Sequence, residues 1–395
     1  MGMLHSSMIR IFALLLLLSS RPAAANINIE AAFAPDTTLD LTVAAIKNAK
    51  QSILLNIYEL SSPYIAEALL TKIQAGVSVQ ILEEGQPVGG FSAASRGIES
   101  QLVQAMKSSS GANHFFVMSS NGTRRFRFDH GKYIIIDGNQ LLIGSENYSP
   151  SGNPSPGTIG NRGWEVLIHD SGIAQNFAGV FRGDASTSFG DVQDMVSGKA
   201  ITYSPPSSSS SFALSGGNIF SASAVQRITS PDSSLSGILS LINHAKRSID
   251  IELMTFDSTP WSAAGNPLVS ALQSAAHRGV SVHVLLNDES AFAHTGPDGQ
   301  PIAISNPKNQ PTVDLLNRTG GSLIAKIANI KGMGVDYIHN KGMIVDGSIT
   351  LISSINWDQN SIQNNREAAV AITSSGLAGF YGNLFERDWQ VSGGQ

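Results

Sequence analysis

The hydrophobic pattern of this chain alternates between two periods. Continuous apolar runs rich in Ile, Val and Leu predict buried strands at Ile53–Tyr58 and Val77–Leu82, and again at Ile249–Met254 and Val280–Leu286. In other segments apolar residues recur every three or four positions, which predicts helices before and between these strands. The first of these segments follows Thr37. Strands that alternate with helices indicate an α/β fold whose sheets are covered by helices.

The same pattern occurs twice along the chain. The segment Ala-Pro-Asp-Thr-Thr-Leu at 34–39 resembles Ser-Pro-Asp-Ser-Ser-Leu at 230–235, and Ala49–Ile53 resembles Ala245–Ile249, both at an offset of 196 residues. A later match has an offset of 203 residues, so the order is kept while the offset grows, as loop insertions would produce. We therefore predict an internal duplication: two similar α/β lobes, each a mixed sheet flanked by helices.

Segments of biased composition divide the chain into parts. Residues 1–25 contain a basic residue, a short apolar run and an Ala-Ala-Ala cleavage site, which predicts a signal peptide cleaved after Ala25 and a secreted or periplasmic protein. The alternative is an uncleaved membrane anchor. Residues 204–216 are rich in Ser and Pro and predict a linker. The two predicted lobes are residues 26–203 and 217–395.

The overall composition narrows the possible chemistry. The chain has no cysteine, which excludes disulfides, thiolate metal ligands and a cysteine nucleophile. Its formal net charge of −5 provides no general basic surface for nucleic acid, although a local basic groove would be compatible with it. Beyond the first 25 residues no apolar run reaches the roughly 18 residues of a membrane span, so we expect no transmembrane segment in the mature chain.

Each half contains one motif that combines an imidazole, an ammonium, a hydroxyl and an amide. His130 is followed by Lys132 and Asp137, and Ser145 and Asn147 lie 15 and 17 residues after the histidine. The second copy has the same spacing in His339, Lys341, Asp346, Ser354 and Asn356. In a strand, residues i and i+2 share a face, and an Asp-Gly pair favours a tight hairpin. The return strand is therefore expected to bring the Ser and Asn back beside the His and Lys.

This set of side chains suits reaction at a phosphodiester. Preorganised ammonium and amide groups can stabilise the charge that develops on the phosphate oxygens. One neutral imidazole can attack phosphorus, while another protonates the leaving oxygen and later activates water. A single motif copy supplies one imidazole only, so the two copies are predicted to form one shared active site.

The doubled pattern HxKxxxxD followed by GSxN resembles the signature of the phospholipase D superfamily. The resemblance implies a phosphohistidine intermediate, no metal or other cofactor, His130 as the nucleophile and His339 as the general acid and base. It also implies a carboxylate behind each histidine. The candidates are Glu367, 28 residues after His339, and Glu165, 35 residues after His130. In the second copy Ser353 replaces the Gly of GSxN, which removes no reacting group.

Two pairs of motif residues have alternative interpretations. Asp137 and Asp346 are candidate catalytic residues by the resemblance, but as turn residues they are equally expected to have a structural role. Ser145 and Ser354 either line the substrate site or support the turn. Both alternatives are open from the sequence alone.

We expect a monomeric phospholipase D that hydrolyses the distal phosphodiester bond of glycerophospholipids at a membrane or micelle surface. Export and the acidic net charge favour a phospholipid over nucleic acid. A secreted metal-independent nuclease and a phosphatidyl transferase are the alternatives, and a catalytically inactive binding module would be expected to have lost a motif His or Lys. Arg124, Arg125 and Arg127 precede the first motif and form either a basic rim for phosphate or a solvated edge.

Overall fold

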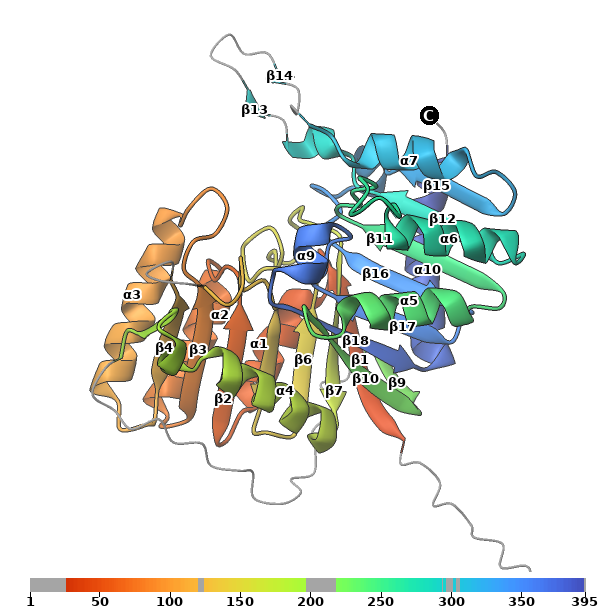
Figure 1. The fold of residues 1–395 in the computed structure, drawn as a ribbon. Helices are drawn as coiled ribbons and strands as arrows, with labels where there is room; N and C mark the ends of the chain where they lie inside the picture. Colours follow the sequence, from red (N-terminus) through yellow and green to blue (C-terminus); the bar gives the residue numbers. More distant parts are fainter. Residues whose placement is uncertain are drawn as a thin grey trace, which may run out of the picture.

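Two sheets flanked by helices form the two lobes of the computed structural model (Figure 1). It describes residues 26–119, 124–196, 218–292, 294–295, 301–302 and 306–393. The predicted signal peptide and the predicted Ser/Pro-rich linker lie outside these ranges, so both remain predictions. Within the described ranges, none of the helices has the length and apolar character needed to cross a membrane.

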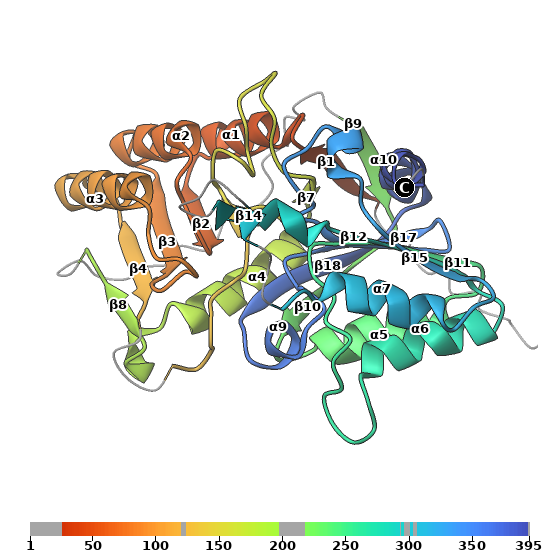
Figure 2. The same cartoon turned by 90° about the horizontal axis from the view of Figure 1, so that it is seen from above.

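The first sheet has nine strands among the described residues, in the order β8-β4-β3-β2-β5-β6-β7-β1-β9. The strands are β1 (Ile27–Ala34), β2 (Ser52–Ile57), β3 (Ser78–Glu84), β4 (His114–Met118), β5 (Tyr133–Ile136), β6 (Gln140–Gly144), β7 (Gly163–His169), β8 (Val192–Asp194) and β9 (Asn218–Ala222). Three helices cover one face of this sheet and a fourth covers the other (Figure 2). They are α1 (Thr38–Asn48), α2 (Pro63–Gln74) and α3 (Ala93–Ser108) on one face, and α4 (Ser171–Asp184) on the other.

The second sheet has seven strands among the described residues, in the order β10-β18-β17-β16-β11-β12-β15. The strands are β10 (Ala224–Ser230), β11 (Ser248–Leu253), β12 (Ser281–Leu286), β15 (Leu323–Ile327), β16 (Lys341–Val345), β17 (Ile349–Ser353) and β18 (Glu367–Thr373). Its helices are α5 (Ser234–His244), α6 (Pro267–His277) and α7 (Asn309–Asn317) on one face and α10 (Ser375–Val391) on the other. The short elements are the 3-10 turns Thr187–Phe189 and Glu289–Phe292, the pair β13 (His294–Thr295) and β14 (Pro301–Ile302), α8 (Ile330–Met333) and α9 (Gln359–Gln363).

Both sheets have the same topology. The order β4-β3-β2-β5-β6-β7-β1 in the first corresponds strand for strand to β15-β12-β11-β16-β17-β18-β10 in the second. In each sheet the first three of these strands are parallel, and the motif strand pairs antiparallel with the third. This confirms the predicted α/β fold of two similar mixed sheets. The second half also contributes β9 to the first sheet, where it pairs with β1.

The strands are continuously apolar because helices cover both faces of each sheet. All four residues of β5 are buried. Ile134 and Ile136 pack into the core beneath α1, α2 and α3, whereas Tyr133 and Ile135 face the core on the other side of the sheet. A strand covered on one face only would have shown polar residues at alternate positions.

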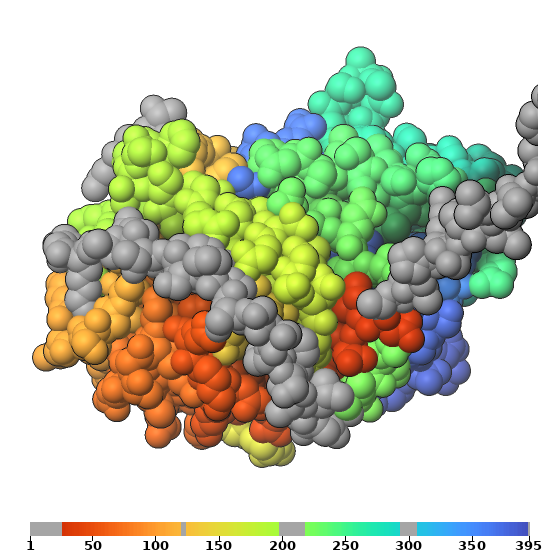
Figure 3. Space-filling model, turned by 90° about the horizontal axis from the view of Figure 1, so that it is seen from below, coloured from red at the N-terminus to blue at the C-terminus, as the bar shows by residue number. Residues whose placement is uncertain are grey.

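The core on that second side belongs to both lobes. Trp164 of β7 stacks on Tyr381 of α10, with ring centroids 4.5 Å apart. The Tyr381 hydroxyl lies within hydrogen-bonding distance of the carbonyl oxygens of Ala32 (3.0 Å) and Glu165 (2.7 Å) in the first sheet. On the face seen from below, α4 lies against the second lobe, where it packs on β10 (Figure 3). The lobes therefore pack as one unit with a continuous apolar interface.

Candidate active site

The histidine of each motif is hydrogen-bonded through its backbone to the other lobe. The amide of His130 donates to the carbonyl of Arg366 at 2.7 Å, and the amide of His339 donates to the carbonyl of Arg162 at 2.9 Å. Because these contacts have the same form in both directions, the lobes are related by an approximate twofold arrangement. The two motifs, 209 residues apart in the sequence, meet where the lobes join.

The imidazole of His130 faces a carboxylate of the second lobe. Its Nδ1 lies 2.8 Å from Oε2 of Glu367, at the start of β18. The fully buried Glu367 side chain accepts hydrogen bonds from the Ser354 hydroxyl at 2.6 Å and the Asn365 amide at 3.0 Å. Burial raises the pKa of Glu367 to about 7. The structure thus brings this predicted carboxylate to the histidine of the opposite lobe.

The imidazole of His339 faces a different carboxylate from the predicted one. Its Nδ1 lies 3.3 Å from Oε2 of Glu146, the variable position of the first GSxN segment. Glu165 is instead buried beneath α1, where it accepts a hydrogen bond from the Thr42 hydroxyl at 2.9 Å. The structure therefore does not place Glu165, the predicted catalytic carboxylate of the first half, beside either histidine. On β7 this side chain points to the face of the sheet that α1, α2 and α3 cover.

The two motif lysines are buried beside the histidines. Each Nζ donates to the carbonyl of its own motif histidine, at 2.8 Å for Lys132 and 2.6 Å for Lys341. The Lys132 ammonium also lies 5.2 Å from the ring centroid of Tyr58, and Lys341 contacts the Met254 sulfur at 3.6 Å. Burial lowers the pKa of Lys132 to about 8. Burial, together with the nearby Lys132, lowers the pKa of Lys341 to about 7.

Both imidazoles have lowered basicity in this environment. Burial, followed by the ammonium groups of Lys132 and Lys341, lowers the pKa of His130 well below its usual value. Burial and Lys341 lower the pKa of His339 to about 4, although Glu146 acts in the opposite direction. The resting site therefore favours neutral imidazoles, beside lysines that lose their protons more readily than usual. A bound phosphate would favour protonation of an imidazole because it brings negative charge into the site.

The amides of the two motifs are available to a ligand. Asn147 and Asn356 follow the return strands β6 and β17, as their spacing predicted. The side-chain oxygen of each is buried and has no hydrogen-bond partner in the part of the chain that the structure describes. Buried polar atoms normally have a partner, so each unpaired oxygen fits a contact with a donor hydrogen of a ligand.

The two motif serines support the site rather than line it. Both are fully buried. The Ser145 hydroxyl accepts from the Trp164 amide at 3.2 Å, and the Ser354 hydroxyl accepts from the Ala368 amide at 3.0 Å while it donates to Glu367. These contacts agree with the alternative in which the two serines have a structural role.

Asp137 and Asp346 lie at the opposite end of the motif strands from the histidines. Both have positive φ angles, 50° and 53°, and each is followed by a glycine with positive φ, as a tight hairpin turn requires. The Asp137 carboxylate accepts backbone amides of residues 50–52 at 2.7–3.1 Å, and the Asp346 carboxylate accepts those of residues 246–248 at 2.6–3.1 Å. The structure therefore places neither aspartate beside the histidines, and these contacts agree with the structural alternative.

Two buried arginines, which the sequence analysis missed, connect the lobes. Arg162 of the first lobe donates to Asp388 of α10 at 2.7 Å, and Arg366 of the second lobe pairs with Asp184 of α4 at 2.9 Å. These are the residues whose carbonyls hold the motif histidines. The sequence does contain a signal for them. The two arginines are 204 residues apart, and so are their two aspartate partners.

The arginines before the first motif are largely engaged within the first lobe. Arg124 donates to both carboxylate oxygens of Glu84 at 2.8 and 2.6 Å. Arg125 pairs with Asp191 at 2.9 Å and donates to two carbonyl oxygens at the end of α4. The predicted basic rim therefore does not include these two side chains.

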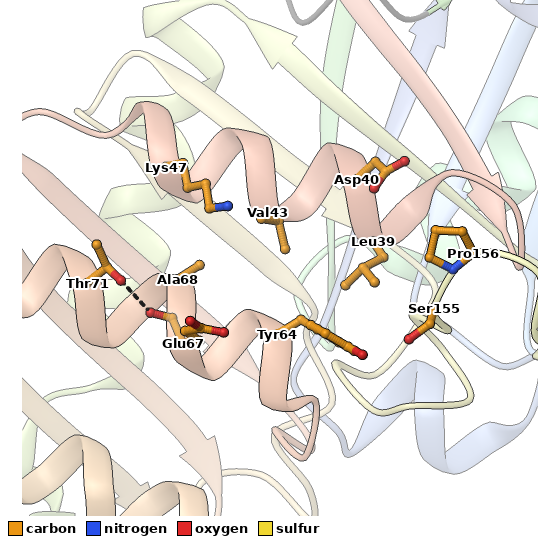
Figure 4. Close-up of a pocket in the computed structure, with 10 residues that line it drawn as sticks. All are labelled: Leu39, Asp40, Val43, Lys47, Tyr64, Glu67, Ala68, Thr71, Ser155 and Pro156. Carbon is orange, nitrogen blue, oxygen red and sulfur yellow. Dashed lines mark hydrogen bonds between the residues drawn. The ribbon is translucent and has the colours of Figure 1, made fainter.

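A groove between α1 and α2 has a volume of about 460 Å³ but contains no motif residue (Figure 4). Its lining residues are Leu39, Asp40, Val43, Lys47, Tyr64, Glu67, Ala68, Thr71, Ser155 and Pro156. The candidate chemistry is therefore located at the junction of the lobes and not in this groove.

Comparison with known families agrees with this geometry. The chain matches the family model described as "Cardiolipin synthase, PLD-like domain" over residues 42–185 and 238–389, one segment in each lobe. The protein therefore belongs to this family, within the phospholipase D superfamily.

Individual relatives carry names of lipid enzymes. The chain is 29% identical over 159 residues to mitochondrial cardiolipin hydrolase of Xenopus tropicalis, covering 40% of this chain and 62% of that protein. It is 28% identical over 159 residues to the protein of the same name from Mus musculus, covering 40% of this chain and 59% of that protein. The matched region thus spans less than two thirds of either relative.

Two solved structures share the fold. Phosphatidylserine synthase of Haemophilus influenzae Rd KW20 superimposes with a TM-score of 0.66 at 15% identity, covering 94% of this chain and 89% of that chain. Polyphosphate kinase of Porphyromonas gingivalis superimposes with a TM-score of 0.52 at 12% identity, covering 91% of this chain and 46% of that chain. At these identities the likeness is one of fold.

Proposed function

We propose that this protein is a phospholipase D that hydrolyses the distal phosphodiester bond of glycerophospholipids to phosphatidic acid and a free head-group alcohol. The observation that carries the proposal is the pairing of two His-Lys-Asn sets, one from each lobe, with each imidazole Nδ1 facing a carboxylate. The family description and the names of three similar proteins refer to phospholipids, which supports a lipid substrate.

The first step transfers the phosphatidyl group to His130. Its neutral Nε2 attacks phosphorus, the P–N bond forms, and the P–O bond to the head group breaks. His339, protonated once the anionic substrate is bound, donates its proton to the leaving oxygen. Lys132, Lys341, Asn147 and Asn356 stabilise the charge on the remaining phosphate oxygens.

The second step regenerates the enzyme. His339, now neutral, takes a proton from water, whose oxygen attacks phosphorus as the P–N bond breaks and its electron pair returns to His130. The products are phosphatidic acid and free enzyme, with His339 protonated again until the product leaves. An alcohol in place of water gives phosphatidyl transfer by the same sequence of bonds.

Two incubations test the proposal, both in the presence of EDTA. Purified protein is incubated with phosphatidylcholine vesicles and, separately, with plasmid DNA. We expect release of choline and no nicking of the plasmid. Nicking without choline release would instead assign a nuclease, and loss of choline release in EDTA would contradict a metal-free reaction. Addition of ethanol measures transfer, because it diverts phosphatidic acid to phosphatidylethanol.

We also propose that the protein acts outside the cytoplasm as a monomer. The predicted export signal within residues 1–25 supports this location. N-terminal sequencing of exported protein is expected to begin at Asn26. Retention of the first 25 residues in the exported form would favour an anchored protein.

A further inference from the structure

The first lobe lacks a carboxylate at the position that Glu367 occupies in the second. In the first sheet Gly144 is opposite Glu165, and in the second Ser353 is opposite Ala369. The residue two positions before Ala369 is Glu367, so its counterpart, two positions before Glu165, is Gly163.

The Glu146 side chain fills the space that a side chain at position 163 would occupy. A Cβ atom added to Gly163 would lie 2.0 Å from Oε1 of Glu146 and 2.6 Å from the Ser145 hydroxyl oxygen. The Asn161 amide donates to Oε2 of Glu146 at 2.9 Å, just as the Asn365 amide donates to the carboxylate of the second lobe at 3.0 Å. The Glu146 carboxylate thus occupies a place equivalent to that of the Glu367 carboxylate. Its backbone position differs, because Glu146 follows β6 whereas Glu367 begins β18.

The second lobe shows the converse arrangement. The counterpart of Glu146, one residue before the motif asparagine, is Ile355. This side chain is fully buried in the core beneath α5, α6 and α7. Each lobe therefore supplies one carboxylate to the junction, from β18 in the second lobe and from the end of β6 in the first.

We propose that Glu146 is the positioning residue of His339, in place of the side chain that Gly163 lacks. The inference rests on the proposed two-histidine reaction. Glu146 holds the proton on Nδ1, which directs Nε2 toward the leaving oxygen, and it stabilises the imidazolium that donates the proton.

The surroundings of His339 single out Glu146 for this role. Its buried Nδ1 has no well-aligned hydrogen bond to any described residue, and Glu146 is the carboxylate within ion-pair distance. The contact of 3.3 Å is longer than the 2.8 Å contact of the other half-site. Contacts of this kind are often long in an empty site and shorten when substrate binds.

Glu146→Gln tests the inference, with Glu165→Gln as the matched control on the neighbouring strand. With phosphatidylcholine, we expect Glu146→Gln to lower kcat about 100-fold and to leave KM within about three-fold, while Glu165→Gln keeps the wild-type values. A kcat of Glu146→Gln within about three-fold of wild type would overturn the proposal.

The leaving group distinguishes proton donation from general disruption of the site. 4-Nitrophenolate departs without protonation, so the pre-steady-state burst of 4-nitrophenol from bis(4-nitrophenyl) phosphate should stay near the wild-type rate in Glu146→Gln. An equal loss of the burst and of choline release would mean that Glu146 has a structural role only. Wild-type protein with no burst and no choline release would contradict the proposed function itself, before this question arises.

Relocation of the carboxylate provides the rescue experiment. Glu146→Ala removes it and vacates part of the space beside Gly163; the Ser145 hydroxyl must still rotate away from a new Cβ at that position. The double variant Glu146→Ala with Gly163→Glu returns the carboxylate from the position used in the second lobe. We expect kcat of the double variant to exceed that of Glu146→Ala at least about ten-fold. A folded double variant, judged by an unchanged thermal midpoint, with no gain over Glu146→Ala would count against the proposal.

Discussion

The two halves of the junction contain the same catalytic groups but support them differently. His130 faces a carboxylate on strand β18 at 2.8 Å, and two side chains hold that carboxylate in place. His339 faces Glu146, just after β6, at 3.3 Å; this carboxylate is held by the Asn161 amide at 2.9 Å and, more loosely, by the Ser145 hydroxyl at 3.5 Å. Each Nδ1 therefore faces a carboxylate, but the two carboxylates come from positions that do not correspond in the two halves.

Replacement of either histidine should have the largest effect and should separate their roles. Both His130→Ala and His339→Ala are expected to lower choline release at least about 10⁴-fold. With bis(4-nitrophenyl) phosphate, however, His339→Ala should still release one equivalent of 4-nitrophenol and accumulate a phosphoenzyme, because only its hydrolysis needs the second imidazole. Mass spectrometry of the quenched protein measures the adduct. An adduct formed by His130→Ala, and not by His339→Ala, would reverse the assignment.

The buried arginines should give the next largest effect, on stability. Arg162→Met leaves the buried Asp388 carboxylate with Arg387, whose exposed guanidinium lies 3.6 Å away, as its remaining described cationic partner. The substitution should lower the free energy of unfolding by about 3 kcal/mol. Denaturant unfolding measures the loss. The control adds Asp388→Leu, which removes the buried charge and should recover part of the stability. A double variant no more stable than Arg162→Met would contradict this account of the lobe junction.

The lysines should give a moderate, pH-dependent effect. An amine binds phosphate in its protonated form, which predominates below its pKa, so kcat/KM should fall as pH rises through the values of about 7 for Lys341 and about 8 for Lys132. With substrate bound, the phosphate charge favours the protonated amines, and the fall in kcat should occur at higher pH. Initial rates between pH 5 and 10 test this. A kcat/KM that rises up to pH 9 would contradict it.

Glu165→Gln should have the smallest effect on activity and a distinct effect on stability. Burial raises the pKa of Glu165 from 4.5 to about 8, so the folded state favours the protonated form and stability falls as pH rises between these values. The amide of Gln does not titrate, so the variant lacks this loss of stability at high pH. The difference in thermal midpoint, variant minus wild type, should therefore be more positive at pH 9 than at pH 5. Thermal midpoints at both pH values measure it. A large loss of kcat in Glu165→Gln would indicate that Glu165 takes part in the reaction.

Much of the architecture could be predicted because it depends on local pattern. The apolar runs identified four strands to within a residue or two, and the Asp-Gly turns after β5 and β16 have the predicted hairpin geometry. The motif spacing identified the residues that meet at the junction. These features depend on side-chain periodicity and turn chemistry, both of which are properties of short segments.

The remaining features depend on contacts between distant segments. His130 and His339 lie just before their strands, because their amides bind the opposite lobe and not a neighbouring strand. The residue count from the first motif points to Glu165, but an insertion in the first half changes that count. Alignment of the repeated Asn-Arg pair at 161–162 and 365–366 would have identified Gly163 as the equivalent of Glu367.

The different origins of the two carboxylates have a consequence for mutation. In a symmetric homodimer with one half-site per subunit, any substitution appears twice, so a carboxylate can move only if both half-sites accept the move at once. Here both halves lie in one chain, and position 163 can become glycine while position 367 stays glutamate. Covalent fusion therefore frees each half-site to specialise, one for attack and the other for proton transfer, by single substitutions that the other half never experiences.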